Sequence, residues 1–185
     1  MTRTHWASSG IAAAMLSLAA FSAPANAQQN PALVTLGIQI WKDTLPCRNC
    51  HGSFGNGVQD IAQEPQGANL RETGLDAATM EMIIRCGLPG TEMPYFDSRA
   101  YTDDRCYGMT REQAGASVPP AGSPPMSPRQ LQGVIAFIIE DFVGKGPVTR
   151  EECRAFWGED ASSCGRYPTA AEAGAAPAAP STPAP

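Results

Sequence analysis

The residues with the clearest chemistry in this sequence are two cysteines three positions apart and the histidine that follows the second of them, in Cys47-Arg48-Asn49-Cys50-His51. Two thiols at this spacing can each add across a vinyl group of haem and form two thioether bonds. The adjacent imidazole is then placed to reach the iron as its proximal ligand. One such motif predicts one covalent haem c, bound through Cys47 and Cys50 and ligated by His51.

Two other chemistries use a Cys-x-x-Cys pair. A thioredoxin-type redox pair belongs to a βαβ unit, and the sequence shows no convincing strand alternation. A structural zinc site needs a second pair of cysteine or histidine ligands. The chain has no second Cys-x-x-Cys, and its only histidine besides His51 is His5, near the N-terminus. The motif therefore favours haem over both alternatives.

The sixth ligand of such an iron must come from elsewhere in the chain. Met93 lies in the segment 87–94 (GLPGTEMP), on a predicted loop just after a helix, and the proline that follows it fixes the backbone. A thioether is a soft ligand that raises the reduction potential of haem iron. We therefore predict Met93 as the second axial ligand, and Met126, Met109 or an open sixth position remain alternatives.

Three predicted helices must position these residues. The first spans 31–44, because its apolar residues recur at helical spacing and a proline follows it. The second spans 76–87 and opens with an aspartate cap and a hydrophobic staple. The third spans 127–144 and opens with a Ser-Pro-x-Gln capping box. This order of helices and loops predicts an all-α fold.

The N-terminal segment 1–27 is typical of a secretory signal peptide. Arg3 is followed by an apolar run of 11 residues and by Ala-Asn-Ala before Gln28. A run of this length spans about half of the ~30 Å hydrocarbon core of a bilayer, so cleavage near Ala27 is favoured over an uncleaved anchor. No later segment is long and apolar enough to cross a membrane. We expect export to the periplasm.

The predicted mature domain spans 28–167 and carries two additions to its helices. They are a long irregular insertion near 94–125 and a short C-terminal appendix at 145–167. Loops of such length are usually functional or face a partner. From 168 to 185 the chain is mostly Ala, Pro, Gly, Ser and Thr, which bury too little apolar surface to fold. We therefore expect a disordered tail there.

Four cysteines lie outside the motif, and an even number in an exported chain predicts two disulfides. Three pairings are possible. We favour Cys86–Cys106, which attaches the insertion to the helix before Met93. The remaining pair, Cys153–Cys164, then closes a local loop in the appendix.

Together these features resemble the class I monohaem c-type cytochromes. The resemblance rests on a Gly-x-x-x-aromatic first helix, the haem motif with its following glycine, a methionine-proline pair and a closing helix, found here at Gly37 and Trp41, Cys47 to Gly52, Met93-Pro94, and Ser127 to Phe142. It covers about 31–142. It implies a small all-α fold wrapped around the haem, in which the first and last helices cross at glycines such as Gly37, and it implies ligation by His51 and Met93.

The sequence departs from the family in the segment that follows the haem motif. The family often has Gly-Pro-Asn-Leu there, and the proline carbonyl accepts the N–H of the proximal imidazole. This chain has Gly67-Ala68-Asn69-Leu70 instead. The carbonyl of Ala68 must therefore serve to orient His51.

The resemblance implies a one-electron carrier without enzymatic activity. Its partners would be redox proteins, such as an exported dehydrogenase or a respiratory or photosynthetic complex. The formal net charge of −5 argues against a nucleic-acid partner, because phosphate binding needs a basic surface. The alternatives are a haem subunit of a larger membrane-associated redox complex and an open-site haem enzyme or gas sensor.

Overall fold

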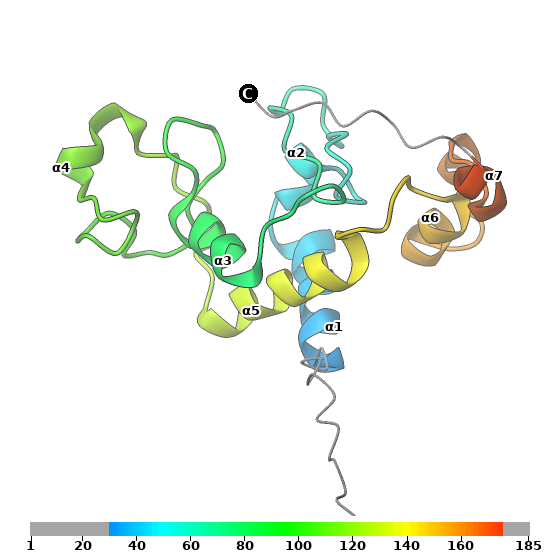
Figure 1. The fold of residues 1–185 in the computed structure, drawn as a ribbon, viewed down its shortest axis with the longest axis horizontal. Coiled ribbons are helices and arrows are strands. Elements are labelled where there is room, and N and C mark those ends of the chain that lie inside the picture. Colours follow the sequence, from blue (N-terminus) through cyan, green and yellow to red (C-terminus); the bar gives the residue numbers. More distant parts are fainter. Residues whose placement is uncertain (1–29, 176–185) are drawn as a thin grey trace, which may run out of the picture.

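The computed structural model of the chain describes residues 30–175 (Figure 1); the expected signal peptide at 1–27 and the tail residues 176–185 lie outside this range. The described residues form seven α-helices and no β-strand, which confirms the expected helical class. The helices are α1 (Pro31–Gln39), α2 (Cys47–His51), α3 (Ala77–Cys86), α4 (Arg111–Ala114), α5 (Pro128–Phe137), α6 (Arg150–Trp157) and α7 (Ala170–Ala175), with π-helical turns at Ile40–Thr44 and Ile138–Phe142 and 3-10 turns at Gly115–Ser117 and Ser162–Arg166. No helix within 30–175 combines the length and the apolarity needed to cross a bilayer.

The second and third predicted helices begin at the capping residues that the sequence indicates. Asp76 accepts a hydrogen bond from the Thr79 N–H at 2.8 Å and opens α3. Ser127 and Gln130 form a reciprocal capping box that opens α5. These contacts satisfy backbone N–H groups that have no partner within their own helix. Both helices are therefore confirmed, together with the local interactions that start them.

The main core forms where α1 crosses α5, two helices far apart in the sequence (Figure 1). At the crossing, a Cβ atom on Gly37 would lie 2.1 Å from the Gly133 carbonyl oxygen and 2.5 Å from Phe137 Cβ. Trp41, which is 1% exposed, meets the rings of Phe137 and Phe142 edge-on at centroid distances of 5.9 and 5.0 Å. The two helices touch backbone to backbone because Gly37 and Gly133 leave the room for it.

The insertion at 94–125 is folded, although the sequence indicates only an irregular loop. It has a small core that it shares with the end of α3, made by Cys86, Ala100, Tyr101, Cys106 and Ala114. The Cys86–Cys106 disulfide joins the two parts and confirms the expected pairing. The helix α4 also lies here. A helix of four residues is too short to show an apolar period, so its sequence signal is limited to the Thr110 and Gln113 capping box that opens it.

The C-terminal appendix packs against the loop that follows the haem motif. The ring of Phe54 meets those of Phe156 and Tyr167 edge-on, at centroid distances of 5.4 and 5.5 Å. The second expected disulfide, Cys153–Cys164, is present and its two cysteines are buried in the same cluster. The appendix is therefore attached to the site region by aromatic contacts and stabilised internally by its own cross-link.

An ion pair between a buried arginine and a half-buried glutamate also joins the appendix to this loop. The side chain of Arg71 is 2% exposed, and its Nη1 and Nη2 lie 2.6 and 3.0 Å from the two carboxylate oxygens of Glu152. Arg71 donates further hydrogen bonds to the carbonyls of Phe54 and Gly146. A buried guanidinium needs such a bidentate partner to offset its lost hydration. The charge of Arg71 is thus neutralised by a residue of α6.

The described part of the tail corrects one expectation. Sequence composition predicts disorder over 168–185, yet α7 forms within this range. Thr169 and Glu172 exchange hydrogen bonds at its start, and the Ala170 N–H donates to the Glu151 carboxylate at 2.9 Å. These contacts are polar, and the last of them joins α7 to α6. They do not depend on the apolar burial from which disorder was predicted.

An ion pair in the insertion makes stability depend on pH. Hydrogen bonds from Arg105 hold the pKa of Asp103 at about 2, below its ordinary value of 3.8. Because the folded chain favours the ionised carboxylate, its stabilisation is complete above pH 3.8 and is lost as the pH falls toward 2. We expect the free energy of unfolding to decrease over this interval and Asp103→Asn to flatten the decrease.

Urea titrations at stepped pH would measure this dependence. The exposed neighbour Asp104 supplies the matched control, because Asp104→Asn removes the same charge without the Arg105 contact and should keep the wild-type slope. Equal slopes for the wild type and Asp103→Asn would contradict the expectation.

Candidate functional site

The cysteine motif itself forms α2, a single helical turn. It places Cys47 and Cys50 about one turn apart and His51 at its end. Gly52 ends the helix with a φ of 78°, and a Cβ atom on it would lie 2.3 Å from the Val58 carbonyl oxygen. Only glycine fits both the left-handed backbone and this close approach. The chain therefore turns sharply after His51 and folds back over the motif.

A backbone carbonyl holds the imidazole of His51 at its Nδ1 atom. Its Nδ1 lies 2.9 Å from the Ala68 carbonyl oxygen, the contact that the sequence departure at Ala68 calls for. A carbonyl can only accept, so Nδ1 carries the proton and Nε2 is left unprotonated, the form that binds a metal. Burial lowers the pKa of His51 and favours the neutral ring.

Gly67 makes this arrangement possible, and the sequence offers no signal for it except its position before Ala68. A Cβ atom on Gly67 would lie 2.7 Å from His51 Nδ1 and 2.9 Å from its Cε1. The Gly67 N–H also donates to the Cys50 carbonyl at 2.9 Å. The loop after the motif is thus anchored on α2 at the point where it meets the imidazole.

Both cysteines of the motif are thiols that resist ionisation. Burial raises the pKa of Cys47 to about 12. Burial and the negative charge of Glu64 raise the pKa of Cys50. A redox-active Cys-x-x-Cys pair depends on a lowered thiol pKa, so these surroundings do not favour thioredoxin-type chemistry. Neither cysteine takes part in a disulfide.

The surroundings of the motif also do not supply a zinc site. Among residues 30–175, no group of three or more His, Cys, Asp or Glu side chains converges on a position that would hold a metal ion. A tetrahedral zinc site takes its protein ligands from such a group. The residues of the motif would need further ligands that the described part of the chain does not bring to them.

The structure divides the candidate methionines between two clusters. Met93 and Met126 are partly buried against the main core, as is Cys47. Met109 packs instead in the core of the insertion, near Cys106. Two of the three methionine candidates for the sixth position therefore border the same apolar cluster as the motif, and Met109 does not.

A tight turn shapes the backbone just before Met93. The Thr91 hydroxyl accepts a hydrogen bond from the Met93 N–H at 3.1 Å and donates to the Leu88 carbonyl at 2.8 Å. The Leu88 N–H in turn donates to the Met93 carbonyl at 3.2 Å. Met93 therefore lies at the end of a turn that hydrogen bonds hold in place.

A polar pocket of about 380 Å³ lies between the motif and the appendix. Its lining includes Arg48 of the motif, which pairs with Asp60 at 3.2 Å, and Trp157 and Tyr167 of the appendix. The lining, drawn from the described residues, contains none of the two cysteines, the histidine and the methionine predicted to hold haem. This pocket is therefore separate from the candidate haem site.

The site thus consists of a neutral imidazole with a free Nε2, two neutral thiols on the same helical turn, and a thioether on a fixed turn bordering the same core. This donor set suits a covalently attached, soft-ligated iron porphyrin.

Comparison of the chain with protein-family models, curated proteins and solved structures finds no match.

Proposed function

We propose that this protein is a c-type cytochrome of cytochrome c-like fold, which carries one covalent haem and passes single electrons between redox proteins. The observation that carries the proposal is the 2.9 Å contact between His51 Nδ1 and the Ala68 carbonyl oxygen. It orients the ring and leaves Nε2 for iron, on the helical turn that also bears both cysteines. Such an anchored imidazole is the arrangement that an axial ligand requires.

Each residue of the site has a distinct task in this proposal. Cys47 and Cys50 would attach the porphyrin to α2, and His51 and Met93 would ligate its iron. When bound, the haem provides an iron centre that changes its charge by one electron. The Ala68 carbonyl keeps the imidazole proton at Nδ1, and the apolar cluster beside Cys47 and Met93 excludes water from the attachment side.

A carrier is favoured over an enzyme because the proposed site is closed. If His51 and Met93 both ligate the iron, it has no open position for a substrate. His51 is the one histidine of the chain beyond the predicted signal peptide, so no second imidazole is available for acid–base catalysis there. The proposed partners are an exported dehydrogenase and a respiratory or photosynthetic complex, met in the periplasm through small, transient interfaces.

Absorption spectra of the exported protein would test the proposal. A haem that stays with the chain in denaturing gels and a pyridine haemochrome with two saturated vinyl groups are expected. Cys47→Ala and Cys50→Ala should each leave one vinyl group unsaturated and shift the haemochrome band. A chain that releases its haem on denaturation, or binds none, would overturn the proposal.

Addition of carbon monoxide to the reduced protein would separate a carrier from an open-site protein. A closed site should show the far-red charge-transfer band of methionine-bound ferric iron and should not respond to the gas. Rapid carbon monoxide binding by the wild type would instead favour the enzyme or gas-sensor alternative.

A further inference from the structure

The segment 86–93, which we call the Met93 segment, leaves α3 at Gly87 and ends at the proposed ligand. Gly87 has a φ of 66°, so the backbone changes direction there. Its turn is closed locally by Thr91, as described above. The insertion at 94–125 supplies the further contacts that hold the segment as a whole.

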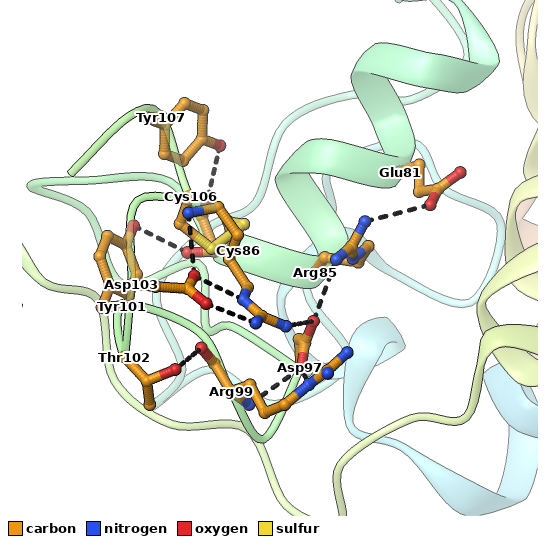
Figure 2. The surroundings of a disulfide bond; sticks show 12 residues. Glu81, Arg85, Cys86, Asp97, Arg99, Tyr101, Thr102, Asp103, Cys106 and Tyr107 are labelled. Atoms are coloured by element: carbon orange, nitrogen blue, oxygen red, sulfur yellow. Dashed lines mark hydrogen bonds and ion pairs between the residues drawn. A yellow bond between two sulfur atoms is a disulfide. The ribbon is translucent and has the colours of Figure 1, made fainter. Parts of the chain in front are cut away.

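Two tyrosines of the insertion donate hydrogen bonds to successive carbonyls at the start of the Met93 segment. The Tyr101 hydroxyl donates to the Cys86 carbonyl at 2.9 Å, and the Tyr107 hydroxyl donates to the Gly87 carbonyl at 2.7 Å. Figure 2 shows both phenols pointing from the insertion toward the end of α3, beside the Cys86–Cys106 disulfide. The direction in which the backbone leaves α3 is thus fixed by side chains of a separate element.

The insertion also contacts the middle of the Met93 segment. The Gly90 N–H donates to the Ser117 carbonyl at 2.8 Å. At Gly87, the ring of Pro119 lies so close that a Cβ atom there would be 2.8 Å from its Cγ. The segment is therefore held at both its first and its central peptide groups.

The insertion is built to keep its two tyrosines in place. Tyr101 and Tyr107 are the two non-glycine residues of the described chain with positive φ, at 60° and 56°. Such a backbone is costly for a bulky residue and persists only where the surroundings fix it. Here the disulfide and the ion pair between Arg85 and Asp97, at 3.1 Å, fix the insertion to α3 (Figure 2).

We propose that the insertion is a clamp on the Met93 segment and that Tyr107 is a positioning residue, which determines how readily Met93 leaves the iron. This inference rests on the proposed function. Release of Met93 requires the segment to swing away about Gly87, and that motion breaks the hydrogen bond between Tyr107 and the Gly87 carbonyl. Each bond of this kind lowers the population of the released state.

Binding of free imidazole to the ferric protein measures that population, because imidazole takes the sixth position only when Met93 has left it. Tyr107→Phe keeps the ring and removes the hydroxyl. We expect it to raise the apparent affinity for imidazole about five- to tenfold, the effect of one lost hydrogen bond to a buried carbonyl. Tyr95→Phe is the matched control: Tyr95 also belongs to the insertion, but its hydroxyl is bonded to Arg111 at 3.1 Å.

The outcomes separate the clamp from the proposed function. Wild-type affinity in both variants, with the methionine–iron band intact, would overturn the clamp alone. Absence of that band in the wild type would overturn the His51/Met93 site itself. Equal increases in Tyr107→Phe and Tyr95→Phe would mean that the insertion is merely loosened, and would also overturn the specific role of Tyr107.

Hydrogen exchange gives a second readout that does not depend on haem spectra. The amides of Leu88 and Gly90 are bonded to the Met93 and Ser117 carbonyls, so their exchange reports opening of the segment. We expect faster exchange at both amides in Tyr107→Phe and unchanged exchange in Tyr95→Phe. Unchanged exchange in Tyr107→Phe would contradict the clamp.

Discussion

Replacement of Gly37 by alanine is expected to lower the free energy of unfolding by about 2–3 kcal/mol, because the new methyl group has no space at the helix crossing. Its Cβ would lie 2.1 Å from the Gly133 carbonyl oxygen, which belongs to the backbone and cannot rotate away. The helices α1 and α5 must then move apart and loosen the packing around Trp41. Alanine has the higher helix propensity, and that gain of about 1 kcal/mol is included in the expected net loss.

A series of glycine substitutions provides the controls, measured by urea unfolding. At Gly133, a Cβ atom would meet the Leu33 carbonyl oxygen at 3.1 Å, so Gly133→Ala should cost less than Gly37→Ala. At Gly174, in the exposed helix α7, nothing lies within 4 Å, and alanine should be neutral or slightly stabilising. Equal stability of Gly37→Ala and Gly174→Ala would contradict the close crossing.

Replacement of Met93 by alanine is expected to open the iron site of the proposed cytochrome. The ferric protein should lose its methionine charge-transfer band, the reduced protein should bind carbon monoxide, and the reduction potential should fall because the soft thioether is gone. His51 and the two cysteines are untouched, so the haem should remain attached. Spectra and a potentiometric titration would measure all of these changes together.

The other two candidate methionines are the controls for this prediction. Met126→Ala also removes a partly buried methionine from the main core, so it reports the effect of lost packing alone. Met109→Ala changes the core of the insertion. Both should keep the charge-transfer band and remain closed to carbon monoxide. Loss of the band in Met126→Ala but not in Met93→Ala would assign the sixth ligand to Met126.

The parts of the fold that could be predicted from the sequence are those that local interactions determine. The caps at Asp76 and Ser127 lie within three residues of the N–H groups that they bind, so the pattern is visible in the chain itself. The contact between His51 and Ala68 spans 17 residues and is not local; it could be predicted because the family resemblance expects a backbone carbonyl at the position of Ala68. Two disulfides could be expected from four further cysteines in an exported chain. Of the three possible pairings, the favoured one is the one that forms.

The parts that could not be predicted depend on contacts between distant segments. Gly133 has no special pattern around it, and its importance appears only when α1 lies across it. The hydrogen bond from Tyr107 to Gly87 joins residues 20 positions apart through a folded insertion whose core has few members. Composition also predicted disorder where α7 forms, because composition does not show polar contacts such as the hydrogen bond between Ala170 and Glu151.

The ion pair between Arg71 and Glu152 limits how far this protein can be shortened. Arg71 belongs to the loop that follows the candidate site, whereas Glu152 belongs to an appendix that a minimal helical domain does not need. A chain cut at Gly144 would lose both the Glu152 carboxylate and the Gly146 carbonyl, so that only the Phe54 carbonyl would remain as an acceptor for the Arg71 side chain. Loss of the partner of a buried guanidinium costs more stability than loss of an exposed pair. We therefore expect a chain without the appendix to be less stable than the full chain, and replacement of Arg71 by an apolar residue to recover part of that loss.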